Sequence, residues 1–98
     1  MIHVYNHLAI DSQNEMVYYL GYTLTLTRAE YGLLLSLIRS EDGTAPDGFT
    51  LADGMTAIPK SSVKVHVCNV NKKAEAIGGR RLVVWDEGCK RYFLNEYM

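Results

Sequence analysis

The chain is short of the residues and runs on which several classes of protein depend. Among its 98 residues are only two cysteines, two prolines and one tryptophan. No apolar run reaches the roughly 20 residues that span a bilayer, and no basic-then-apolar leader opens the chain. Two cysteines, Cys68 and Cys89, do not make a disulfide framework. We therefore expect a single cytoplasmic domain, residues 1–98, with free thiols.

Motifs for catalysis and metal binding are also missing. The chain has no G-x-S-x-G, no Cys/His pair at metal-ligand spacing and no glycine-rich phosphate loop. His3 and His7 stand four residues apart, but in an extended segment they are about 13 Å apart, too far for one ion to bridge. The sequence predicts no enzyme, no cofactor and no metal site.

Charge is unevenly distributed. The net charge is −1. Residues 1–55 hold two basic and seven acidic residues, whereas residues 56–98 hold eight basic and four acidic ones. This asymmetry favours an anionic partner at the C-terminal half.

The first 26 residues predict three or four short antiparallel strands. The runs IHVY, HLAI, MVYYL and YTLTL are rich in Tyr, Val, Thr and Leu and are separated by turn-like DSQN and by Gly21. In TLTL, the leucines at 24 and 26 alternate with threonines, as in a half-buried strand.

The pattern of a first helix follows directly. Thr27-Arg28-Ala29-Glu30 has the form of a capping box, and an apolar stripe runs from Tyr31 to Ile38 at helical spacing. Gly43 is the expected stop. A short second helix is expected to start at Phe49 or Thr50.

The stretch SSVKVHVCNVNKKA predicts a third helix, from about Ser62 to Ala76. Ser61 or Ser62 is the expected N-cap, and Gly78-Gly79 the expected C-cap. Beyond it, LVVW and CKRYFL, separated by Asp86-Glu87-Gly88, predict a β-hairpin over residues 82–94. The expected fold class is α+β.

The third helix has one clearly apolar face and one unusual face. Val63, Val67, Val70, Ala74 and Ile77 share an arc of roughly 80°, which we expect to be buried. The opposite face carries Val65, Cys68, Asn69 and Lys72. An uncharged centre with basic flanks suits the major groove of DNA, since Asn can pair with adenine, Val can touch a thymine methyl and Lys can meet phosphates.

Taken together, these motifs resemble the OmpR/PhoB-type winged helix-turn-helix effector domain of two-component response regulators. The motif Leu26-Thr27-Arg28-Ala29-Glu30-Tyr31-Gly32-Leu33-Leu34 resembles that family's "LT-x-x-E-[FY]-x-L-L" first helix. SSVKVHVCNVNKKA resembles its recognition helix, usually "T-V-D-V-H-I-S-R-L-R-K-K-L", and LVVWDEGCKRYFL resembles its wing. Lys64, Asn69 and Asn71 depart from the family pattern, which has an acid and two arginines at these positions.

The resemblance implies an N-terminal antiparallel sheet, three helices and a C-terminal wing that together bind double-stranded DNA and regulate transcription. Helix 62–76 would enter the major groove and the hairpin 82–94 would rest on the minor groove or backbone. The expected DNA-binding residues are Ser62, Lys64, Val65, His66, Cys68, Asn69, Asn71, Lys72, Lys73, Lys90 and Arg91. Val65 and Asn69, with Cys68, would read bases, and most of the others would position the domain on phosphates.

Two further partners follow from the same resemblance. The loop 43–60 resembles a segment that touches RNA polymerase, and family members often bind direct repeats as head-to-tail pairs. The family's receiver domain is absent here, so we expect either an effector domain excised from a longer chain, which is the preferred interpretation, or a stand-alone regulator. The rival interpretation is a winged helix that binds protein through the loop 43–60, because the net charge is negative, two arginines are missing and seven tyrosines are present.

Overall fold

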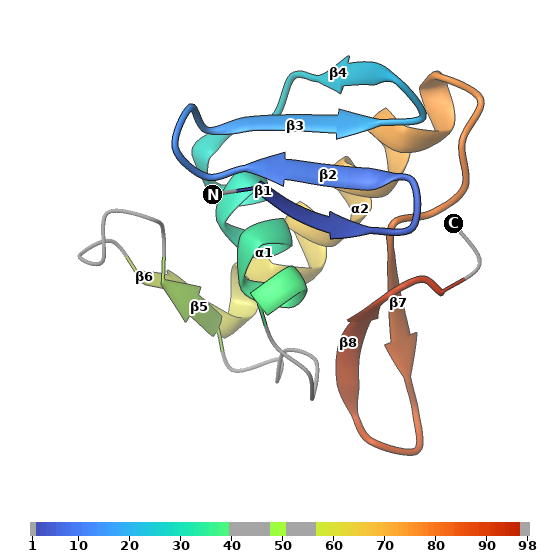
Figure 1. The fold of residues 1–98 in the computed structure, drawn as a ribbon. Helices are drawn as coiled ribbons and strands as arrows, with labels where there is room; N and C mark the ends of the chain where they lie inside the picture. Colours follow the sequence, from blue (N-terminus) through green and yellow to red (C-terminus); the bar gives the residue numbers. More distant parts are fainter. Residues whose placement is uncertain (1, 40–47, 51–56, 97–98) are drawn as a thin grey trace.

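The computed structural model describes residues 2–39, 48–50 and 57–96. Within these ranges the chain forms two helices and eight short strands (Figure 1). In chain order they are β1 (Ile2–Tyr5), β2 (Leu8–Asp11), β3 (Met16–Tyr19), β4 (Tyr22–Leu24), α1 (Arg28–Arg39), β5 (Gly48–Thr50), β6 (Ala57–Pro59), α2 (Lys60–Ala76), β7 (Val83–Asp86) and β8 (Arg91–Leu94). The α+β class predicted from the sequence is confirmed.

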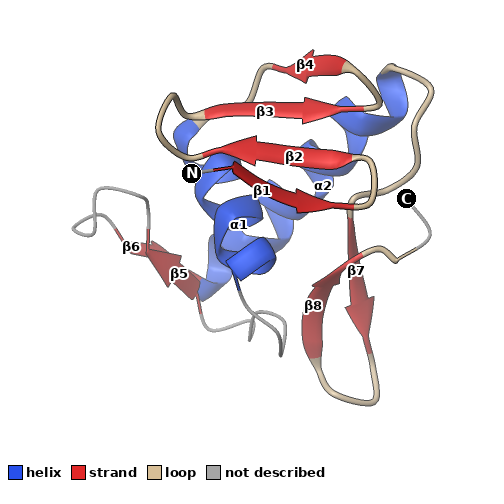
Figure 2. Ribbon diagram, in the orientation of Figure 1, coloured by secondary structure: helices blue, strands red, loops and turns tan. Residues whose placement is uncertain are grey.

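The N-terminal segment folds into a four-stranded antiparallel sheet in the order β1-β2-β3-β4. Figure 2 shows both helices on one side of this sheet. Residues facing the helices alternate with residues facing away, so Leu8, Ile10, Val17 and Leu24 are buried whereas Tyr18 is exposed. The alternation predicted for residues 23–26 is present, with both threonines exposed.

Helix α1 begins with the predicted capping box. The Glu30 N–H donates to Thr27 Oγ1 at 3.2 Å, and the Thr27 N–H donates to Glu30 Oε1 at 3.1 Å. Behind the cap, Tyr31 and Leu34 lie in the apolar core. The expected stop at Gly43 lies outside the described residues.

The expected three helices are a wrong prediction for the described part of the chain, which holds two. Phe49 and Thr50, the expected start of a short helix, lie in strand β5 and pair with Ile58 and Ala57 of β6. Aromatic and β-branched residues favour such a ladder over a helix that Gly54 would have cut short. Residues 51–56 lie outside the described ranges.

Tyr19 of β3 joins the sheet to the end of α2. Its side chain is fully buried, and its hydroxyl accepts the Arg80 N–H at 3.1 Å. A Cβ on Gly79 would collide with the Tyr19 ring and would lie 3.0 Å from the Ala74 carbonyl oxygen. Glycine at position 79 therefore allows the chain to pass over the sheet as it leaves α2.

Strands β7 and β8 form the predicted antiparallel hairpin, which projects away from the sheet (Figure 1). Val83 and Leu94 pair at its base and are buried. Trp85 and Tyr92 pair two residues closer to the tip, with ring centroids 4.8 Å apart in an edge-to-face contact. Neither described helix is long and apolar enough to cross a membrane.

Candidate nucleic-acid interface

Helix α2 begins earlier than predicted and without a serine cap. Pro59 is the N-cap, with φ −73° and ψ 158°, and no side chain caps the helix. The prediction of Ser61 or Ser62 as N-cap is wrong, because strand β6 leads directly into the helix and places both serines inside its first turn. Ser61 is exposed and Ser62 is half-buried.

The C-terminal end of α2 has the predicted glycine cap. Gly78, with φ +86°, donates its N–H to the Glu75 carbonyl at 3.0 Å, and the Gly79 N–H donates to the Ala74 carbonyl at 3.1 Å. These two bonds make a Schellman motif. They end the helix sharply and turn the chain toward the hairpin.

The two faces of α2 are as predicted except at Ile77, which is half-buried and lies at the C-cap just beyond the helix. Val63, Val67, Val70 and Ala74 are at most 7% exposed and pack in the core. The opposite face exposes Lys64, Val65, Cys68, Asn69 and Lys72 to solvent. Val65 is 57% exposed.

Two of the predicted DNA-binding residues have partners inside the protein. Lys73 Nζ lies 2.5 Å from Oε1 and 3.2 Å from Oε2 of the buried Glu30 carboxylate. Asn71 hydrogen-bonds to the backbone of Leu82 and Val83. These contacts turn both side chains away from the exposed face. His66 is half-buried.

The hairpin contributes the remaining two predicted residues. Lys90 is exposed in the turn with φ 54°, and Arg91 is half-buried at the start of β8. Asp86 organises this turn, because its Oδ1 accepts the N–H groups of Gly88 at 2.8 Å and Cys89 at 3.1 Å. The Lys90 ammonium lies 4.0 Å from Glu87, and both side chains are highly exposed, so this pair contributes little.

A groove of about 670 Å³ separates α2 from the hairpin. Its walls include Lys64 and Cys68 on the helix and Trp85 and Tyr92 on the hairpin. Burial raises the pKa of Tyr92, and charge on the nearby Cys68 raises it further. Side chains of the helix and of the hairpin therefore face the same groove.

Arg81 also lines this groove, although the predicted site omits it. Its Nε lies 3.6 Å from the Glu75 carboxylate. The signal in the sequence was present, since Arg80 and Arg81 directly follow the glycine cap of α2. What the sequence could not show is that the chain turns back beside Lys64.

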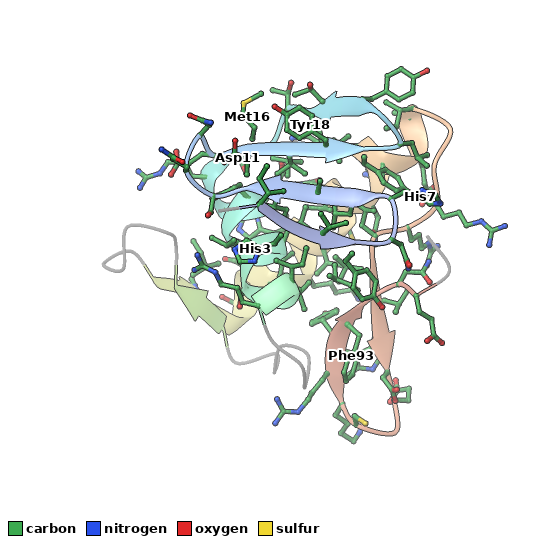
Figure 3. The ribbon with its side chains drawn as sticks, viewed as in Figure 1. His3, His7, Asp11, Met16, Tyr18 and Phe93 are labelled. Carbon is green, nitrogen blue, oxygen red and sulfur yellow. The ribbon has the colours of Figure 1, made fainter. Side chains whose placement is uncertain are left out.

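The described ranges hold no group of three His, Cys, Asp or Glu residues that could bind a metal ion. Figure 3 shows His3 in β1 and His7 past the other end of that strand, in the turn before β2. Phe93, also labelled there, belongs to the hairpin.

The fold is similar to those of two solved structures. Its structure is similar to the DNA-binding domain of the response regulator AdeR in complex with an intercistronic region, with a TM-score of 0.69 and 24% identity over 95% of this chain and 97% of that one. It is also similar to a member of a family of redox sensors in the streptococci that evolved from two-component response regulators, with a TM-score of 0.75 and 24% identity over 96% of this chain. The chain spans 42% of that second protein.

Both neighbours are consistent with the OmpR/PhoB-type effector domain expected from the sequence. No protein-family model matches the chain, and no curated protein matches it either.

Proposed function

We propose that this chain binds double-stranded DNA with sequence specificity and regulates transcription. The exposed face of α2 carries the proposal. It combines an aliphatic side chain, an amide and two lysines, and no acidic residue occurs in the helix before Glu75. A helix of this kind fits the major groove, where amides and methyl contacts read base edges.

Base reading is assigned to Val65 and Asn69, with Cys68 between them on the same exposed face. Val65 can contact a thymine methyl, and the Asn69 amide can donate to and accept from an adenine edge. The proposed phosphate contacts come from both ends of this surface: Ser62, Lys64, His66 and Lys72 on the helix, and Lys90 and Arg91 on the hairpin.

Asn71 and Lys73, which the sequence assigned to phosphates, are proposed to support the interface instead. Each already has a partner within the protein. A lysine held by a buried carboxylate would have to give up that pair to reach a phosphate, which costs free energy.

The hairpin β7–β8 is proposed as the wing on the adjacent minor groove or backbone. Its turn carries Lys90 and is stiffened by the Asp86 hydrogen bonds. The AdeR neighbour is a DNA-binding domain with the same fold, which supports this arrangement. Contact of residues 43–60 with RNA polymerase, and head-to-tail pairing on direct repeats, stay predictions.

Selection from a random duplex pool followed by fluorescence anisotropy across a salt series tests the proposal. The expected result is an enriched motif. A plot of its log affinity against log salt concentration should fall with a slope that corresponds to the release of several ions. No binding even at low salt would overturn it and favour the rival function, a protein-binding winged helix.

A further inference from the structure

The Asn71 side chain joins α2 to the first residues of the hairpin. Its Oδ1 accepts the N–H groups of Leu82 and Val83, each at 3.0 Å, and its Nδ2 donates to the Val83 carbonyl at 3.0 Å. The Asn71 amide therefore uses both lone pairs of its oxygen and one of its two N–H donors. All three bonds go to two consecutive residues at the start of the hairpin. Leu82 and Val83 are buried, where an unpaired backbone group is costly.

The other contacts of the described hairpin with the body of the protein lie toward its base, where β8 also meets α1 and Tyr92 packs against the core. Val83 and Leu94 are buried at its base, whereas residues 85–90 are all exposed. A four-residue strand is about 13 Å long. A tilt of about 20° at the base would therefore move the tip by more than 4 Å, enough to break any hydrogen bond made there.

We propose that Asn71 is a positioning residue that fixes the hairpin at one angle to α2, so that helix and hairpin meet DNA as a single rigid surface. The effect on DNA binding rests on the proposed function. The fixed angle between the hairpin and α2 does not. Asn95 provides the matched control. Its Nδ2 donates to the Arg81 carbonyl at 2.9 Å at the same hairpin base, and Arg81 lies beyond the end of α2.

The geometry can be tested without DNA, because the chain carries one exposed cysteine on each element. Nitroxide labels on Cys68 and Cys89 report the distance between α2 and the hairpin turn. The wild type and Asn95→Ala should give a narrow distance distribution, and Asn71→Ala one at least twice as wide. Asn71→Asp, which keeps the acceptor oxygen but loses the donor, should be intermediate and also serves if the alanine variant does not fold. Unchanged widths in both Asn71 variants would overturn the proposal.

The consequence at DNA is tested by a double-mutant cycle. In the wild type and in Asn95→Ala, replacing Lys90 and Arg91 by alanine should weaken binding to a selected duplex at least tenfold. In Asn71→Ala, whose hairpin is no longer held, the same replacements should cost less than twofold. Equal losses in all three backgrounds would contradict the proposal. If the wild type binds no duplex, the proposed function fails while the label distances still decide the role of Asn71.

Discussion

The Lys73 ammonium of α2 lies 2.5 Å from Oε1 of Glu30, and the same oxygen accepts the N–H of Thr27 at the start of α1. One carboxylate, only 1% exposed, thus caps the first helix and anchors the second. The orientation of α2 relative to α1 therefore depends on this pair as well as on the buried valines of α2.

Replacing Lys73 with Met should therefore destabilise the protein. The Glu30 carboxylate would stay buried without its cation, at a cost of about 1–3 kcal/mol once the partial exposure of Lys73 is allowed for. Urea unfolding at neutral pH measures the change. Lys72→Met, on the exposed face one residue earlier, should change stability by less than about 0.5 kcal/mol. Equal effects of the two replacements would contradict the structural role of Lys73.

Replacing either of the two glycines that end α2 should destabilise the protein, but for different reasons. Gly79→Ala places a Cβ against the fully buried Tyr19 ring, and we expect a loss of about 1–3 kcal/mol from overpacking. Gly78→Ala meets no atom within 4 Å, but its φ of +86° strains any L residue, so we expect a loss of about 1–2 kcal/mol. Asn at position 78 should recover part of its loss, because Asn tolerates this conformation. Asn at position 79 should recover none of the stability that Gly79→Ala loses. Thermal unfolding of the four variants measures this, and an equal recovery at both positions would contradict the two causes.

Tyr31 should make stability depend on alkaline pH. Its hydroxyl is buried without a hydrogen-bond partner among the described residues, and desolvation raises the pKa of Tyr31 above its usual value near 10. The folded state then holds the proton more tightly than the unfolded chain, so stability is complete below about pH 10 and falls as pH rises further.

Tyr31→Phe removes both effects. The variant should be as stable as the wild type or more stable by up to about 1 kcal/mol at pH 7, and its advantage should grow as the pH rises above about 10. Tyr18→Phe, on the exposed face of the sheet, should change neither quantity. An advantage for Tyr31→Phe that shrinks with pH would show that the sign of the shift is wrong.

The exposed lysines of α2 should contribute to DNA affinity independently of the base sequence, because they contact phosphates. Alanine at Lys64 or Lys72 should lower the slope of log affinity against log salt by about 0.9 each and weaken binding to all duplexes by a similar factor. Anisotropy titrations at several salt concentrations measure both. Gln13→Ala, in the turn after β2, is the control and should leave the slope unchanged. A loss confined to one duplex would contradict the assignment to phosphates.

Local patterns in the sequence were enough to predict much of the fold. The capping box of Thr27 and Glu30, the valine arc of α2 and the double glycine after it depend on neighbours within one or two turns, so the printed order of residues contains them. The strand pairing of Phe49 with Ile58 was missed, because a nine-residue separation of this kind leaves no periodic signal in a segment rich in glycine and proline.

The candidate site was predictable only in part, for the same reason. Helical periodicity correctly placed Val65, Cys68 and Asn69 on the exposed face. It could not reveal that Asn71 meets Val83, or that Lys73 meets a carboxylate 43 positions earlier. Such contacts depend on how α1, α2 and the hairpin pack together, so they cannot be predicted from the spacing of residues along one helix.

The central claim is that the exposed face of α2 reads base edges. It is tested most directly by measuring the affinity of wild type and Asn69→Ala for a selected duplex and for each of its single-base-pair variants at one salt concentration. The account predicts that Asn69→Ala loses about 1–3 kcal/mol of discrimination at one base pair and keeps it at the others. Unchanged discrimination at every position would contradict the assignment of base reading to this face of α2.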